Sequence, residues 1–216
     1  MIDRLKKHFR NLRSLKVLEI GFGHGYLLKR LCDEGLECYG IDISVSAVNN
    51  AIRIGLKKDR LFLGDFAEFN FNSRFDVIIM NGVLEELRDP LFVMDKIKNI
   101  TSRNSVIIIR TKNASFHRFA YKYLNFFSFL IKSAGVFASY GFTYKSIVIL
   151  LSKYDFEIED VYLDLTKGDP YKQFSFSSFL GFIKKVYYFI SLLFFKLSLK
   201  HILISPSFMV FAVRKR

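Results

Sequence analysis

Short apolar runs alternate with amphipathic patterns through the first two-thirds of the chain, and this alternation constrains the fold more than any other feature. Five runs have the length and composition of buried strands: 16–20, 37–41, 60–63, 75–80 and 105–110. Helical patterns lie between most of these runs. Apolar strands that alternate with helices form right-handed βαβ units, which build a parallel sheet covered on both faces. The sequence therefore predicts an open α/β fold.

The last third of the chain is rich in aromatic residues. Apolar residues recur at helical spacing over 111–142 and again over 170–205, and many of them are Phe or Tyr. Between these segments the pattern predicts a helix over 143–154, capped by Thr143, and a strand over 156–163. The chain closes with the strand-like run SFMVFAVRKR. We therefore expect a cap insertion and an aromatic-rich helical insertion on the α/β frame.

Length and composition limit the class of protein. A chain of 216 residues is enough for one domain with modest additions, so one domain is expected over 1–216. The apolar content of 51% excludes a disordered chain. A formal charge of +13 predicts an anionic partner, which is nucleic acid, a membrane surface or a phosphorylated acceptor. Two cysteines are too few for a disulfide framework or a metal cluster, so reduced thiols and no metal site are expected.

The first residues combine basic side chains with apolar residues at helical spacing, which predicts a short basic helix over 1–15. Such a helix could serve as a lid or contact a membrane. No apolar signal-peptide core follows the basic residues, so the protein is expected in the cytoplasm.

The sequence GFGHG after the first strand is the expected ligand site, because open α/β sheets bind ligands at the carboxyl ends of their strands. Gly21, Gly23 and Gly25 have GxGxG spacing, whereas the dinucleotide fingerprint requires GxGxxG. Glu19 precedes the turn, and a negative side chain there disfavours pyrophosphate and favours a cationic ligand. His24, inside the turn, is a candidate helix cap.

Acidic residues at the ends of the next two strands extend this signal. Asp42 ends the second strand about twenty residues beyond the glycines, where a carboxylate can accept hydrogen bonds from ribose hydroxyls. Asp65 follows the third strand, where its carboxylate suits an exocyclic amine, and Phe66 beside it suits a flat ring. The three strand ends together predict a nucleoside with a positive charge.

These segments resemble the class I S-adenosylmethionine-dependent methyltransferases. EIGFGHG resembles the first motif of that family, GID its ribose acid, GD its adenine contact and FDVIIMNGVLEELRDP its fourth-strand segment. FTYKSIVILLSKYDFEIEDV resembles its last crossover helix and sixth strand, and the segment order is similar to the MetW-type and ubiquinone-type members. The resemblance implies a Rossmann-like, mostly parallel sheet of seven strands with helices on both faces, and a last strand over 207–213 inserted antiparallel.

The resemblance also implies roles for single residues around the cofactor S-adenosylmethionine. Glu19 would bond to the methionine amino group and Asp42 to the ribose, while Asp65 and Phe66 would recognise the edge and the face of adenine. Gly21, Gly23 and Gly25 would let the backbone approach the cofactor, Ile43 would pack on adenine, and Asn81 would sit near the sulfonium and the acceptor.

The chain departs from the family after the fourth strand. The family's common glutamate-histidine pair is here Glu85 and Glu86, so a histidine base is absent at that place. Acids also favour the first turn of a helix, which is the alternative role for both residues. If the acceptor is a hydroxyl, the candidate proton acceptors are Glu85, Glu86 and His117, in that order.

Three functions follow from this sequence. The first is a methyltransferase for a small acceptor, either lipid-linked or anionic, that acts from the cytoplasm with peripheral contact to the inner membrane face. The second is an RNA methyltransferase, favoured by the charge but disfavoured because the fourth strand ends in MNGV and lacks an NPPY-like tetrad. The third is a non-catalytic, cofactor-binding scaffold. The aromatic helices would then contact a membrane, the acceptor or a second subunit.

Overall fold

The computed structural model describes residues 1–13, 15–124, 139–164, 189–191, 193–194, 197–198, 203 and 205–215. Most of the predicted insertion over 170–205, and the part of the cap over 125–138, lie outside these residues, as does His201.

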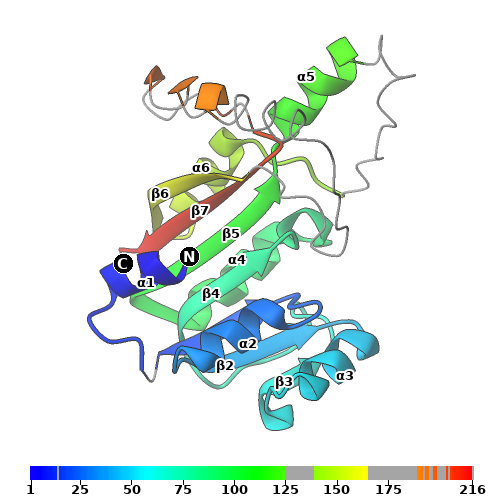
Figure 1. The fold of residues 1–216 in the computed structure, drawn as a ribbon, viewed down its shortest axis with the longest axis vertical. Coiled ribbons are helices and arrows are strands. Elements are labelled where there is room, and N and C mark those ends of the chain that lie inside the picture. Colours follow the sequence, from blue (N-terminus) through cyan, green and yellow to red (C-terminus); the bar gives the residue numbers. More distant parts are fainter. Residues whose placement is uncertain are drawn as a thin grey trace, which may run out of the picture.

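A sheet of seven strands forms the centre of the described structure (Figure 1). Its order is β3-β2-β1-β4-β5-β7-β6, and only β7 runs antiparallel to its neighbours. The strands are β1 (Lys16–Ile20), β2 (Glu37–Asp42), β3 (Leu61–Leu63), β4 (Phe75–Asn81), β5 (Thr101–Lys112), β6 (Phe156–Asp164) and β7 (Ser207–Arg214). The predicted seven-stranded, mostly parallel sheet with an antiparallel last strand is therefore confirmed.

Helices cover both faces of this sheet, which explains why the central strands β1 and β4 bury consecutive apolar residues. Val77 and Ile79 of β4 belong to one core cluster, and Ile78 and Met80 belong to the other. The helices are α1 (Ile2–His8), α2 (Tyr26–Asp33), α3 (Val45–Arg53), α4 (Pro90–Asn99), α5 (Ala114–Leu124) and α6 (Tyr144–Lys153), with the 3-10 turns η1 (Lys58–Arg60) and η2 (Leu84–Glu86).

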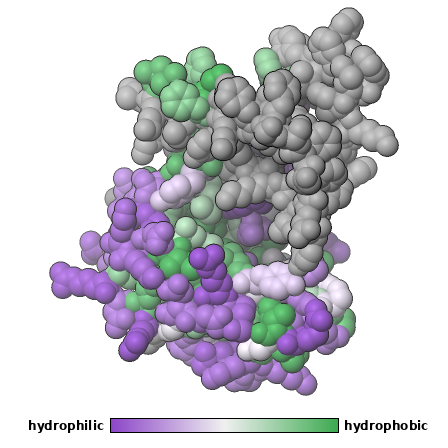
Figure 2. All heavy atoms as spheres, in the orientation of Figure 1, coloured by the Kyte–Doolittle hydropathy of each residue, from purple (hydrophilic) through white to green (hydrophobic). Residues whose placement is uncertain are grey.

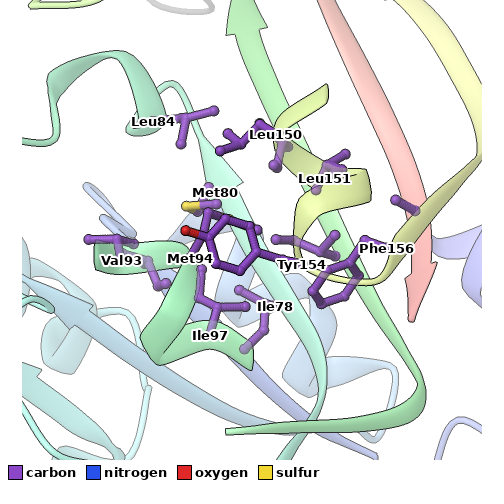
Figure 3. Close-up of a cluster of buried hydrophobic side chains, with 14 of the residues drawn as sticks. Ile78, Met80, Leu84, Val93, Met94, Ile97, Leu150, Leu151, Tyr154 and Phe156 are labelled. Atoms are coloured by element: carbon purple, nitrogen blue, oxygen red, sulfur yellow. The ribbon is translucent and has the colours of Figure 1, made fainter. Parts of the chain in front are cut away.

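The two core clusters divide the helices between the faces. One face is covered by α1, α2 and α3, whose apolar residues pack with alternate residues of β1, β4 and β5. The other face is covered by α4 and α6 (Figure 3), where Val93, Met94 and Ile97 meet Leu151 and Tyr154. The Tyr154 hydroxyl donates a hydrogen bond to the main-chain oxygen of Leu91 (2.9 Å), so its one polar atom is satisfied inside the core.

Side chains cap the starts of α3 and α6, and the cap of α6 is the predicted Thr143. The Ala47 N–H donates to Ser44 Oγ (3.3 Å) at the start of α3. Thr143 and Ser146 form a reciprocal capping box at the start of α6. The predicted cap at His24 is wrong, because Gly25 in a left-handed conformation precedes α2 and no side chain caps that helix.

The predicted basic helix over 1–15 is shorter in the structure. It ends at His8, because Phe9 is extended and the chain beyond it buries Leu12 in the core instead of continuing the helix. Arg4 forms ion pairs with Glu159 and Asp160 of β6, and His8 Nε2 lies 3.3 Å from the main-chain oxygen of Asn104 near the start of β5. This contact places α1 at the amino end of a parallel strand, so the predicted lid role is not supported.

The cap is attached to the chain just before β7. Asn113 Nδ2 donates to the main-chain oxygens of Leu203 and Ser205 (both 2.9 Å), and His117 Nε2 lies 3.0 Å from that of Pro206. The start of α5 and residues 203–206 are thereby joined beyond the carboxyl end of β5. Helical turns precede this junction at 189–191, 193–194 and 197. Within the described part of the chain, no helix is both long and apolar enough to cross a bilayer.

Candidate active site

The candidate site lies at the carboxyl ends of β3, β2, β1 and β4, which are neighbours in the sheet. The strand order reverses between β1 and β4, since β2 lies on one side of β1 and β4 on the other. Open α/β sheets bind ligands at such a switch point. All nine residues predicted to contact the cofactor lie within these four strand ends or directly after them.

The glycines of the turn after β1 serve two purposes. A Cβ at Gly21 would lie 2.3 Å from Cγ2 of Val83, and one at Gly25 would lie 3.1 Å from Cβ of Ala51. These two positions are therefore glycine because the turn packs closely against the protein. A Cβ at Gly23 would meet nothing within 4 Å, so Gly23 faces open space. Among the three glycines, only Gly23 leaves room for a ligand beside the backbone.

Glu19 is a buried acid at the end of β1. Its side chain is 2% exposed, and its Oε2 atom has no hydrogen-bond partner. Burial and, to a smaller extent, the charge of Asp42 raise the pKa of Glu19, a hydrogen bond from the Leu28 main chain opposes both, and the resulting pKa is about 8. A buried carboxylate oxygen without a donor costs free energy unless a ligand supplies one. The site therefore fits a ligand with a cationic N–H donor, such as the amino group of S-adenosylmethionine.

Asp42 links the turns that follow β1 and β2. Its Oδ2 accepts a hydrogen bond from the Gly23 N–H (2.8 Å), and its Oδ1 accepts one from the Ser44 N–H (2.9 Å). Each carboxylate oxygen has a second lone pair, so both can still accept a ribose hydroxyl. The same bonds fix the orientation of the carboxylate beside Gly23.

Two exposed apolar side chains flank the end of β2. Ile43 is 76% exposed and Leu63, at the end of neighbouring β3, is 51% exposed. Asp42 and Leu63 are register partners, so both side chains belong to the same end of the sheet. These side chains suit the faces of an adenine ring. The sequence interpretation missed Leu63, although its place directly before the GD motif was a usable signal.

Asp65 and Phe66 follow β3, but Phe66 has a different environment from the one expected. Asp65 Oδ1 accepts a hydrogen bond from the Ala67 N–H (2.8 Å). The ring of Phe66 is only 3% exposed, and it stacks on Phe71 with the ring centroids 6.1 Å apart. Little of the Phe66 ring is therefore left to cover adenine, and the exposed area lies on Ile43 and Leu63.

Asn81 ends β4, and Arg110 is its register partner near the end of the neighbouring strand β5. The Asn81 side chain is exposed, and its Oδ1 accepts a hydrogen bond from Arg110 Nη1 (3.4 Å). The Gly82 N–H donates to the main-chain oxygen of Arg110 (2.8 Å), and a Cβ at Gly82 would meet nothing within 4 Å. A cation therefore lies beside the predicted acceptor position. The sequence interpretation did not single out Arg110, because a basic residue at a strand end has no motif of its own.

The three candidate proton acceptors do not form one cluster. Glu85 is 2% exposed, its Oε2 accepts a hydrogen bond from Thr111 Oγ1 (2.8 Å), and its main-chain oxygen accepts one from the Tyr140 N–H (3.1 Å). His117 contacts the Pro206 carbonyl at the cap junction. Glu86 is exposed. Both glutamates lie in the first turn of the 3-10 helix η2, which agrees with their alternative role as charges at the start of a helix. Glu85 and His117 hold the cap, and Glu86 is the one of the three whose side chain faces solvent.

Within the described ranges, no group of His, Cys, Asp and Glu could hold a metal ion. Cys32 and Cys38 are free thiols. A hydrogen bond between their side chains lowers the pKa of Cys32 to about 7.

The fold and the site together define a class I S-adenosylmethionine-dependent methyltransferase. The chain belongs to the methyltransferase-domain family, whose model matches residues 1–161. The predicted family resemblance is therefore confirmed, and with it the cofactor that the family uses.

Relatives and solved structures agree with this assignment. The chain is 26% identical over 130 residues to a ubiquinone biosynthesis O-methyltransferase of Histophilus somni, with 55% of this chain and 54% of the relative covered. It is 28% identical over 112 residues to a tRNA U34 carboxymethyltransferase of Campylobacter fetus, with 49% of this chain and 39% of the relative covered. The chain thus spans about half the length, or less, of these curated relatives.

The fold is similar to that of magnesium protoporphyrin IX methyltransferase from Synechocystis, a structure with bound S-adenosylhomocysteine. The TM-score is 0.65 at 18% sequence identity, with 99% of this chain and 80% of that chain covered. At this identity the similarity concerns the fold alone.

Proposed function

We propose that the protein transfers a methyl group from S-adenosylmethionine to a small, lipid-linked acceptor. The observation that carries the cofactor part is the buried Glu19 Oε2 without a partner, next to Asp42 and the open space at Gly23. Burying an acid away from water at a strand end destabilises the fold, and a ligand ammonium group would supply the hydrogen-bond donor and the opposite charge that this acid lacks.

The residues of the site have separate tasks in this proposal. Glu19 accepts hydrogen bonds from the ligand amino group, Asp42 accepts them from ribose, and Ile43 with Leu63 keeps water from the adenine faces. When bound, the cofactor supplies a methyl group that its sulfonium makes electrophilic. The protein therefore has mainly to align the acceptor and exclude water. For a hydroxyl acceptor, Glu86 is the candidate that takes the proton, because Glu85 is buried and paired.

Two observations support the acceptor class. The relative in Histophilus somni is named for ubiquinone biosynthesis, whose acceptors carry a lipid tail. Arg110 at the end of β5 provides a cation for an acidic or phenolic acceptor. We propose that the protein works in the cytoplasm against the inner membrane face, where such an acceptor resides. The tRNA-modifying relative and the charge of +13 favour RNA as the second candidate.

Calorimetric titration with S-adenosylmethionine and S-adenosylhomocysteine tests the cofactor site. Wild type should bind both ligands, and Asp42→Ala should lose most of the affinity because the ribose acceptors are gone. Asp59→Ala is the matched control, since it removes an exposed carboxylate outside the site, and it should bind like wild type. Absence of binding to wild type, or equal affinity of Asp42→Ala, would contradict the proposal.

A further inference from the structure

The helical turns before β7 expose an apolar surface, which we call the docking face: Phe189, Ile190, Leu193, Phe194 and Leu197. These side chains are between 43% and 73% exposed. In an α-helix, positions i, i+1, i+4, i+5 and i+8 lie on one side. Ser191 falls on the other side and is fully buried. Among the described residues of this segment, the five apolar side chains are therefore exposed on one side, and Ser191 on the other side is buried. Figure 2 shows this green area at the upper left, beyond the carboxyl end of the sheet.

The same part of the sequence carries charge of a single sign. Residues 111–154 and 170–206 contain eleven lysines and arginines and no aspartate or glutamate. The exposed Arg118 and Lys145 belong to this set, and Phe119 beside Arg118 is 61% exposed. Every acid of the chain lies outside these two segments, so most of the net positive charge belongs to the sequence that carries the docking face.

The docking face is tied to the end of the sheet where the site lies. The chain that follows it, at Leu203, Ser205 and Pro206, is held by Asn113 and His117 at the start of α5. Arg110 and Thr111, just before this junction, contact Asn81 and Glu85 respectively. A partner bound to the docking face would therefore lie on the side of the protein from which an acceptor enters.

We propose that the docking face binds the surface of an anionic lipid bilayer. An exposed apolar side in a stretch of sequence whose charged residues are all lysine or arginine fits the boundary between headgroups and acyl chains, whereas nucleic acid offers no apolar surface to an aliphatic and Phe-rich side. A second copy of the chain fits poorly, because the two copies would bring only cations together. The link between this surface and a lipid-linked acceptor rests on the proposed function, but the binding itself does not.

Vesicle flotation of the full chain tests this inference without any methyl transfer. One set of vesicles contains phosphatidylcholine alone, and the other contains equal parts of phosphatidylcholine and phosphatidylglycerol. Wild type should float with the anionic vesicles at low salt, float much less at high salt, and stay unbound with neutral vesicles. The triple variant Phe189→Ser, Phe194→Ser, Leu197→Ser should partition at least about tenfold less. Ile149→Ser is the control, because Ile149 is 60% exposed on α6 outside the docking face, and it should bind like wild type.

Other outcomes overturn the inference. The inference fails if wild type does not bind anionic vesicles, or if the triple variant binds them as wild type does. It also fails if Ile149→Ser loses as much vesicle binding as the triple variant. If sedimentation velocity shows a dimer that the triple variant dissociates, the face is an interface between copies instead. Circular dichroism and S-adenosylhomocysteine titration of the triple variant verify that it is folded. If the triple variant is not folded, Arg118→Glu tests the inference instead, because it should weaken binding to anionic vesicles while the affinity for the cofactor stays unchanged.

If flotation fails while cofactor binding is intact, the docking inference is contradicted and the proposed function still stands.

Discussion

Replacing Glu19 by Gln should change the pH dependence of stability in a defined direction. Burial raises the pKa of Glu19 to about 8, whereas an unfolded glutamate titrates near 4.3. Between these values the folded protein holds a proton that the unfolded chain has lost. The free energy of unfolding therefore falls as pH rises, by up to about 1.4 kcal/mol per pH unit. By pH 8 the accumulated loss is at most about 5 kcal/mol.

The Gln variant keeps the size of the side chain and cannot ionise. It should therefore unfold at nearly the same urea concentration as wild type near pH 4 and at a clearly higher one at pH 8, with a stability gain of a few kcal/mol. Urea unfolding between pH 4 and pH 8, without ligand, measures this. Glu68→Gln is the control, because Glu68 is exposed, and it should follow wild type. Parallel pH profiles of wild type and Glu19→Gln would refute the reasoning.

Three further results are expected. Cofactor binding at pH 7 should release close to one proton, since a pKa of about 8 leaves about nine in ten Glu19 side chains protonated before binding; titrations in buffers of different ionisation enthalpy measure it, and equal heats would contradict it. Gly21→Ala should lower the free energy of unfolding by at least about 2 kcal/mol because its Cβ would clash with Val83. Gly23→Ala should lower it by about 1 kcal/mol and should mainly weaken cofactor binding. Equal losses of stability in thermal melts of the two variants would contradict this. Thr111→Val should destabilise by about 1 to 3 kcal/mol because Glu85 loses its side-chain donor, and an unchanged urea midpoint would show that the bond is unimportant.

Much of the fold was predictable because the sheet is covered on both faces. Strands such as β4 then bury consecutive apolar residues, here Val77 to Met80, and the helices between them have one apolar side. The site acids were predictable for a related reason: Glu19 and Asp42 lie at the ends of buried strands, so their place in the sheet is fixed by the sequence order. The end of α1 was not predictable, because Leu12 continues the helical spacing of apolar residues. In the structure Leu12 lies beyond the helix, in non-helical chain, and is still buried in the core.

The parts of the site that depend on distant contacts could not be predicted. The burial of Glu85 depends on Thr111, which lies on β5, and on Tyr140, which follows the cap in the sequence. Phe66 is buried because Phe71 folds back onto it. Leu63 is exposed because β3 is a short strand at the edge of the sheet. For Glu85 the deciding contacts come from other elements, and for Phe66 and Leu63 the exposure depends on how a loop folds and on which strand forms the sheet edge, which no local pattern records.

Transfer of a labelled methyl group tests the central claim most directly. The protein is incubated with S-adenosylmethionine carrying a labelled methyl group and with a cell extract separated into lipid, small-molecule and RNA fractions. We expect label in the lipid fraction with wild type, and little with Asp42→Ala. Label in the RNA fraction alone would replace the proposed acceptor by the second candidate. No label in any fraction, from a protein that binds the cofactor, would contradict the claim that this chain is a methyltransferase.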